Sequence, residues 1–208
     1  MLTEIQYGTF ANYSPRGNSD LSKRSRQICG RIKAGKTDQI ERAIPYLERA
    51  ESQVLSPFLN PTVTLVPVPR SAPLAEGALW PAKVVADVLA ANGYGGEILP
   101  LVERIRAVPK SSNSPASERP LIPEHMESMQ VNADLIVPDQ ITIIDDVLTM
   151  GRTMFACAEL LHDAFPNAEI RAFAMIRTQG MIDNIEKIFD PSVGTITGYP
   201  SGKSFRDP

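Results

Sequence analysis

The feature that most constrains the fold is a short run, "ITII" at residues 141–144, which is followed by two acids, a loop and a helix-like segment. A run without alternating charged positions is typical of a central strand in a parallel sheet, which is buried on both faces. We therefore predict a strand over "QITIIDDV" (140–147) and a helix over "TMFACAELLHDAF" (153–165). The predicted helix has an apolar stripe at helical spacing, formed by Met154, Ala158, Leu161 and Phe165.

Strand and helix signals alternate along much of the chain. A β-branched run over residues 62–68 predicts a strand, and "LWPAKVVADVLAANGYG" (79–95) predicts a helix with Pro81 in its first turn and Gly93 at its end. Further strands are predicted over "GEILPLVERI" (96–105) and "EIRAFAMI" (169–176). This alternation implies an α/β fold with a central parallel sheet flanked by helices. Ligands bind such sheets at the carboxyl ends of the strands, where the two acids and the loop are expected.

The chain divides into three segments by pattern and composition. Residues 1–58 are predicted as a basic, mainly helical segment, residues 59–180 as the core, and residues 181–208 as a weakly patterned tail. Within the core, residues 104–128 are rich in proline and serine and are predicted as a flexible loop. Loops of this length in a compact domain are usually functional lids or binding loops, or are disordered. Both alternatives stay open.

Composition limits the class of protein and its compartment. The chain has 208 residues, which suits one compact domain, and no run of about 18 apolar residues predicts a membrane span. The first residues lack the basic start and apolar core of an export signal. The two cysteines, Cys29 and Cys157, lie far apart, which favours free thiols over a disulfide framework. A cytoplasmic protein is the expectation.

Positive charge is concentrated in residues 16–36, although the whole chain has a formal net charge of -3. Seven basic residues oppose the single acid Asp20, which gives this stretch a local charge of +6. Three interpretations fit: a solvated helix face, an anionic substrate nearby, or a surface for a nucleic acid or protein partner. The basic residues are Arg16, Lys23, Arg24, Arg26, Arg31, Lys33 and Lys36.

The acids and the loop suit opposite ends of one ligand. Residues 148–153 offer backbone N–H groups, the Thr149 and Thr153 hydroxyls and a helix N-terminus, which together suit one phosphate group. Gly151 allows the tight or left-handed backbone that a close approach to the phosphate needs. Asp145 and Asp146 would repel that phosphate, but ionised carboxylates accept strong hydrogen bonds from hydroxyls. The pattern therefore predicts a site for a ribose 5-phosphate.

Residues 142–153 resemble the signature of the type I phosphoribosyltransferases, in which an apolar strand, two acids and a hydrophobic residue precede a Thr/Gly loop. The resemblance covers about residues 60–180 and is nearest to the competence-protein F (ComF) branch. In that branch "LVPVPRS" (65–71) matches the strand and loop near pyrophosphate, and "LVERIRAVPKSSNSPASERP" (101–120) resembles the basic flexible loop. The resemblance implies a type I phosphoribosyltransferase fold with a small N-terminal hood. It also implies an enzyme of nucleotide metabolism that uses phosphoribosyl pyrophosphate and Mg²⁺ and transfers ribose 5-phosphate to an unidentified acceptor.

The resemblance also implies roles for particular residues. Asp145 and Asp146 would contact the ribose 2- and 3-hydroxyls, and Asp146 is alternatively a base toward the acceptor. Magnesium would be held through the ligand, with Asp145 as the one protein group considered for it. Closure of residues 107–120 would exclude water. The 5-phosphate would lie against Leu148, Thr149, Met150, Gly151, Arg152 and Thr153, and pyrophosphate against Pro69, Arg70, Ser71, Arg104, Arg106 and Lys110.

Three features depart from the family pattern. Met150 stands where a second hydroxyl is common, Arg152 stands where a small residue is common, and residues 111–113 (SSN) replace a Gln-containing stretch. Arg152 either reinforces phosphate binding or points outward to a partner. The alternative function is therefore a catalytically weak or inactive module that binds phosphoribosyl pyrophosphate or a nucleotide. Such a module would act through protein or nucleic-acid partners, as in a DNA-uptake or phage-defence system, and homo-oligomers are frequent among the proteins that this one resembles.

Two weaker signals do not support other functions. In "GYPSGKS" (198–204) the glycines are one position too close for a P-loop. His125 and His162 are not accompanied by a cysteine pair, so the sequence does not predict a zinc site.

Overall fold

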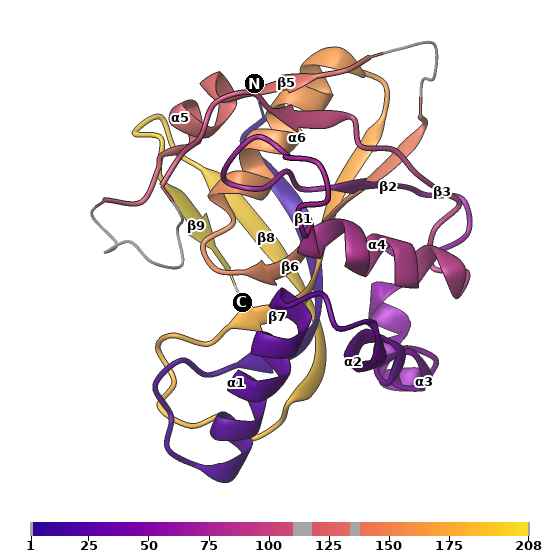
Figure 1. Ribbon diagram of the computed structural model, residues 1–208, viewed down its shortest axis with the longest axis vertical. Helices are drawn as coiled ribbons and strands as arrows, with labels where there is room; N and C mark the ends of the chain where they lie inside the picture. Colours follow the sequence, from indigo (N-terminus) through magenta and orange to yellow (C-terminus); the bar gives the residue numbers. More distant parts are fainter. Residues whose placement is uncertain (1, 110–117, 134–137, 208) are drawn as a thin grey trace.

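The computed structural model describes residues 2–109, 118–133 and 138–207 and has a seven-stranded central sheet in that part of the chain (Figure 1). Its N-terminal elements are β1 (Glu4–Tyr13), α1 (Asp20–Lys33), α2 (Thr37–Glu41), α3 (Ile44–Leu47) and a 3-10 helix η1 (Ala50–Leu55). The middle of the chain forms β2 (Thr64–Pro67), α4 (Pro81–Ala91), β3 (Glu97–Ile98), β4 (Val102–Arg104), α5 (Ile122–Glu127) and β5 (Met129–Val131). The last elements are β6 (Gln140–Leu148), α6 (Arg152–Ala164), β7 (Glu169–Thr178), β8 (Phe189–Gly198) and β9 (Ser204–Arg206).

The central sheet is mostly parallel. Its strand order is β3-β2-β6-β7-β1-β8-β9, and the five strands from β3 to β1 pair in parallel. Strand β8 is antiparallel to β1, and β9 is antiparallel to β8. A separate two-stranded antiparallel sheet joins β4 and β5. The predicted α/β class with a central sheet flanked by helices is therefore confirmed.

Two hydrophobic cores lie on opposite faces of the sheet, which explains the uncharged run at residues 141–144. Ile144 on β6 packs into the core that the apolar faces of α1, α4 and η1 complete. Ile141 and Ile143 pack into the other core, which contains most of α6. Because successive side chains of a strand point to opposite faces, a strand between two cores needs apolar residues at consecutive positions.

The N-terminal segment differs from its prediction as a mainly helical segment outside the core. Strand β1 lies inside the central sheet, between β7 and β8 (Figure 1). Residues 20–55 are helical, but in four short pieces rather than one long helix. The prediction missed β1 because its apolar side chains are separated by polar and glycine positions, and Thr9 and Asn12 are buried along with them.

None of the described helices is long and apolar enough to cross a membrane.

The C-terminal tail was also predicted wrongly, because residues 189–206 complete the sheet. Strand β8 pairs with β1 over most of its length, and β9 forms the far edge. Most positions of β8 are only partly buried, which hides the strand from a search for apolar runs. The predicted flexible loop 104–128 likewise contains the end of β4 and all of α5. Its residues 110–117 lie outside the described part of the chain.

Two substitutions on β8 test whether the C-terminal strands are part of the fold. Ile196→Ala is expected to lower the free energy of unfolding by about 2–5 kcal/mol, because Ile196 is fully buried in the α6 core. Val193→Ala is the control, since Val193 lies on the same strand and is 46% exposed; it should change stability by less than about 0.5 kcal/mol. Urea unfolding measures both. A neutral result for Ile196→Ala would mean that these residues form a loose tail.

Candidate functional site

A cavity of about 410 Å³ opens at the carboxyl ends of β2 and β6. It is lined by the loop after β2, the end of β6, the loop into α6, and single side chains from α1 and α5. This is the edge at which parallel sheets bind ligands. The cavity brings together nearly all the residues predicted from sequence: Pro69, Arg70, Ser71, Arg104, Asp145, Asp146, Leu148, Thr149, Met150, Gly151, Arg152 and Thr153.

The two acids lie near the carboxyl end of β6, within the strand, in agreement with the strand predicted over residues 140–147. Strand β6 continues to Leu148, and Asp145 is in register with Ala174 of β7. The backbone N–H of Asp146 donates a 2.8 Å hydrogen bond to Oδ1 of Asp145. Burial raises the pKa of the Asp145 carboxyl well above its ordinary value, and the negative charge of Asp146 raises it further. The acid pair is thus held close together in a place where two negative charges are unfavourable.

Lys33 partly offsets this repulsion. It is the last residue of α1 and lines the same cavity as the acids. Its positive charge opposes the rise in the pKa of Asp145. The basic N-terminal segment therefore contributes one cation to the site, and this fits the anionic-substrate interpretation of that segment. The position of Lys33 beside the acids depends on how α1 packs across the sheet, which the sequence alone did not indicate.

The loop after the acids has the backbone that a phosphate cradle needs. Gly151 has a left-handed conformation with φ of 78° and is the N-cap of α6. A Cβ at this position would lie 2.6 Å from Cδ1 of Ile196, so both conformation and space require glycine. A glycine cap has no side chain to accept hydrogen bonds from the first N–H groups of α6. The residues that carry these groups, Arg152, Thr153 and Met154, line the cavity, where an anion would satisfy them.

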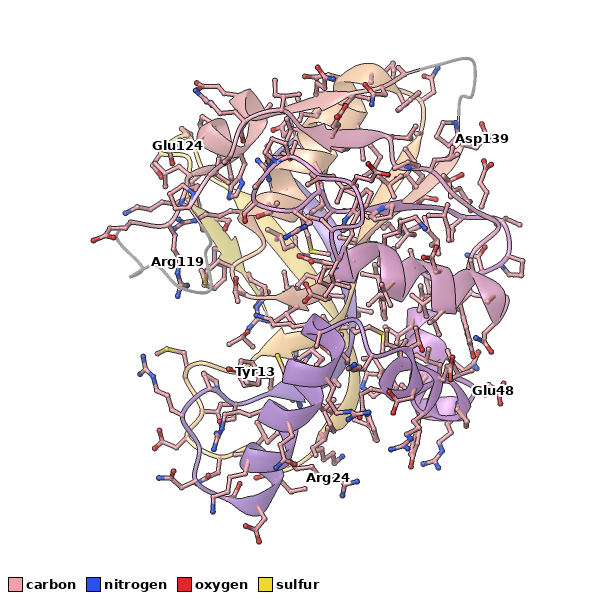
Figure 2. The ribbon with its side chains drawn as sticks, viewed as in Figure 1. Tyr13, Arg24, Glu48, Arg119, Glu124 and Asp139 are labelled. Carbon is pink, nitrogen blue, oxygen red and sulfur yellow. The ribbon has the colours of Figure 1, made fainter. Side chains whose placement is uncertain are left out.

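The two departures from the family pattern, Met150 and Arg152, have defined surroundings. The Met150 side chain is 38% exposed, and its carbonyl accepts a 2.7 Å hydrogen bond from the Ser204 hydroxyl. Arg152 Nη1 donates to the carbonyls of Arg119 and Pro120, at 3.0 and 3.2 Å. This guanidinium thus joins the loop to the segment before α5, whose Arg119 is labelled in Figure 2. These contacts fix Nη1 of Arg152, whereas its Nε is buried and makes no hydrogen bond within the described residues.

The residues predicted to bind pyrophosphate separate into two groups. Pro69, Arg70 and Ser71 lie along the cavity wall formed by the loop after β2. Arg104 also reaches the cavity but is only 2% exposed, and its guanidinium donates to the Arg70 carbonyl, the His125 carbonyl and the Ser128 hydroxyl. Arg104 is thus bound to protein acceptors at the cavity wall, and its role toward pyrophosphate stays a prediction. Arg106 is exposed, forms a 3.5 Å ion pair with Glu127 and does not line the cavity, so the structure does not bring it to the predicted site. Lys110 lies outside the described residues.

His125 is a cavity residue that sequence analysis missed. It is 2% exposed on α5, and its Nε2 lies 3.4 Å from the Thr153 hydroxyl. Its Nδ1 is buried and makes no hydrogen bond within the described residues. Burial lowers the pKa of His125 to about 4, and the positive charges of Arg104 and Arg152 act in the same direction. The neutral imidazole of His125 thus contacts the Thr153 hydroxyl. No spacing motif around His125 in the sequence could have indicated this contact.

The acid pair should cost stability when no ligand is present. Because the folded-state pKa of Asp145 is raised above its unfolded value, the ionised carboxylate destabilises the fold at neutral pH, and stability is regained as the pH falls. Asp145→Asn removes the charge and keeps an oxygen for the Asp146 N–H. It should raise the melting temperature at pH 7, by about 2–4 °C for each kcal/mol of relieved repulsion. Asp139→Asn, at an exposed acid (Figure 2), is the control. An unchanged or lower melting temperature for Asp145→Asn would contradict the electrostatic account.

His125 should contribute a separate loss of stability in acid. Its folded-state pKa of about 4 lies below the ordinary 6.5, so protonation favours the unfolded chain. Its contribution is complete above about pH 6.5 and is lost as the pH falls toward 4. At roughly 1.4 kcal/mol per pKa unit, this loss amounts to about 3 kcal/mol. Urea unfolding of the wild type and of His125→Gln between pH 4 and 7 measures it, since the variant should lack this part of the pH dependence. Parallel curves for the two proteins would show that His125 titrates normally.

Comparisons with known proteins do not place the chain in a family. A scan against protein-family models and a search of curated proteins find no match to the sequence. The functional conclusion below therefore depends on the geometry of the cavity and on the chemistry of its residues.

Proposed function

We propose that this chain is a phosphoribosyltransferase, which binds phosphoribosyl pyrophosphate and transfers its ribose 5-phosphate to an acceptor. The observation that carries the proposal is the joint position of the acid pair and the glycine-capped loop in one cavity at the carboxyl edge of the sheet. One end of the cavity suits a phosphate and the adjacent carboxylates suit hydroxyls. A ribose 5-phosphate offers both groups in one molecule.

The cavity also suits the pyrophosphate end of the ligand. The loop after β2 provides Arg70 and the Ser71 hydroxyl to the same cavity as residues 148–153. The volume of about 410 Å³ falls in the range of small-molecule sites, roughly 300–1,000 Å³. The 5-phosphate would lie on the loop, the ribose hydroxyls on Asp145 and Asp146, and pyrophosphate beside Arg70. This order agrees with a type I phosphoribosyltransferase fold, which the mostly parallel sheet is compatible with.

The acid pair fits a magnesium ion bound mainly through the ligand. Carboxylate oxygens are suitable Mg²⁺ ligands, but the described residues contain no group of three metal-binding side chains. Asp145 is the protein group most suited to the ion, since a cation or hydroxyl donors beside it favour its ionised form. When bound, Mg²⁺ would neutralise charge on the pyrophosphate oxygens.

The transfer itself would be a displacement at C1 of the ribose. A lone pair of the acceptor forms the new bond to C1, and the C1–oxygen bond breaks, with its electron pair leaving on pyrophosphate. Asp146 is the candidate to receive the acceptor's proton, because it lines the cavity beside Asp145, to which the ribose contact is assigned. The residues of this chain would act by positioning and by charge: the loop holds the phosphate, the acids hold the ribose, and Arg70 stabilises the leaving group.

A second candidate function is binding without turnover. Two arginines that the resemblance implied for the phosphates, Arg104 and Arg152, donate to protein acceptors. Arg70 is a cavity arginine whose guanidinium makes no hydrogen bond or ion pair with the described residues. With less charge available for the leaving group, a module that senses phosphoribosyl pyrophosphate and acts through a partner is the alternative.

Calorimetry with phosphoribosyl pyrophosphate and Mg²⁺ tests the site. The double variant Asp145→Asn plus Asp146→Asn should bind at least about 100-fold more weakly than the wild type, because a hydrogen bond to a charged group contributes roughly 1.5–3 kcal/mol. Asp139→Asn should bind as the wild type does. Equal affinity for the double variant would refute the site, and tight binding without pyrophosphate release for any acceptor would favour the sensing module.

A further inference from the structure

A second groove, separate from the candidate active site, lies between α1, α2 and α3. Its volume is about 560 Å³, and it is bounded by α1, the end of α2, α3 and the first residue of β8. None of its lining residues belongs to the cavity with the acid pair. The lining residues are Arg24, Gln27, Ile28, Arg31, Gln39, Arg42, Tyr46 and Phe189.

Three arginines give the groove a positive charge. Arg24 and Arg31 are seven residues apart on α1, so they lie on the same side of the helix about 10 Å apart along its axis. Arg42 faces them from the C-cap of α2. The Asp38 carboxylate, which does not line the groove, forms ion pairs with the guanidinium groups of Arg31 and Arg42, with N–O distances of 2.6 and 3.9 Å. It thus holds these two groups near each other. Arg24, labelled in Figure 2, makes no hydrogen bond or ion pair with the described residues.

The rest of the lining adds donors and no acid. The side chains of Gln27 and Gln39 make no hydrogen bond with described residues, so their amides are available. None of the lining residues is aspartate or glutamate. A concave surface rich in guanidinium and amide donors favours an anion, and guanidinium groups bind phosphate in a bidentate geometry.

The aromatic floor of the groove is already engaged within the protein. The Phe189 ring contacts Phe10 and Tyr46, with centroid distances of 5.2 and 4.5 Å. The Arg49 guanidinium covers the Tyr46 ring at 4.1 Å. These contacts fix the floor and leave recognition to the charged walls. A ligand here is therefore selected by its phosphates more than by the stacking of a base.

We propose that this groove is a binding site for a small polyphosphate, such as a nucleoside triphosphate. Arg24 and Arg31 are separated by about 10 Å along the helix axis, so a chain of phosphates can approach them and Arg42 together more readily than a single phosphate can. The volume of about 560 Å³ is that of a small-molecule site and not of an extended nucleic-acid channel. The site is separate from the proposed transferase site and does not depend on that proposal.

Inorganic triphosphate is the probe, titrated by calorimetry at about 0.15 M salt, where long-range attraction between exposed charges is screened. Arg24→Gln plus Arg42→Gln removes two lining charges from exposed positions, so the fold should be unaffected. Arg16→Gln plus Lys23→Gln removes the same charge from exposed positions outside the groove. The groove variant should bind at least tenfold more weakly than the wild type, and the control variant within threefold of it. Arg70→Gln, which removes the cation assigned to pyrophosphate in the other cavity, should keep the groove's affinity, and this separates the groove from the transferase site.

Three results would overturn the proposal. The first is the absence of triphosphate binding, and the second is an equal loss in the groove and control variants, which would indicate attraction to general positive charge. The third is a single-stranded oligonucleotide that binds in an Arg24- and Arg42-dependent manner and is not displaced by triphosphate. That result would assign the groove to nucleic acid. Displacement of the oligonucleotide by triphosphate, together with the expected loss in the groove variant, would support the small-ligand site.

Discussion

The site depends on the enforced proximity of two carboxylates at the end of a buried strand. Asp145 and Asp146 are adjacent in β6, and burial together with mutual repulsion raises the pKa of Asp145. A fold tolerates such a pair only when other interactions offset its cost. Here the two cores that enclose β6 supply that stability, and Lys33 supplies the nearest opposing charge. Hydroxyl donors or a cation from a ligand would relieve the remaining repulsion, so the unfavourable charge of the free protein becomes a source of affinity.

The loop formed by residues 148–153 is held in place by parts of the chain that are distant in sequence. Ile196 of β8 fills the space beside Gly151, and the Ser204 hydroxyl donates to the Met150 carbonyl. On the other side, Arg152 donates to carbonyls before α5, and His125 of α5 contacts Thr153. The loop is therefore fixed from both sides by the C-terminal strands and by α5. Such support matters because binding sites need ligand-contacting groups held within a fraction of an ångström.

The sequence was sufficient for the elements that follow simple patterns. β6, β7, α4 and α6 have apolar runs or stripes that match their burial, and the loop chemistry predicted a tight or left-handed backbone at Gly151, where the structure has a left-handed one. β1 and β8 were missed because neighbours far along the chain bury, or partly bury, polar residues of these strands. The protein contacts of Arg104 and the position of His125 in the cavity were not predicted, for a related reason. Their roles arise from tertiary contacts between β4, α5 and the loop after β2, which no local spacing records.

The central claim is that the acid pair and the loop bind opposite ends of one phosphoribosyl ligand. A crystal structure of the protein with phosphoribosyl pyrophosphate and Mg²⁺ tests it most directly. The account predicts the 5-phosphate within about 3 Å of the backbone N–H groups of residues 149–153. It also predicts the ribose hydroxyls on the carboxylates of Asp145 and Asp146. A phosphate bound elsewhere, or a ligand whose ribose does not reach either carboxylate, would contradict the account.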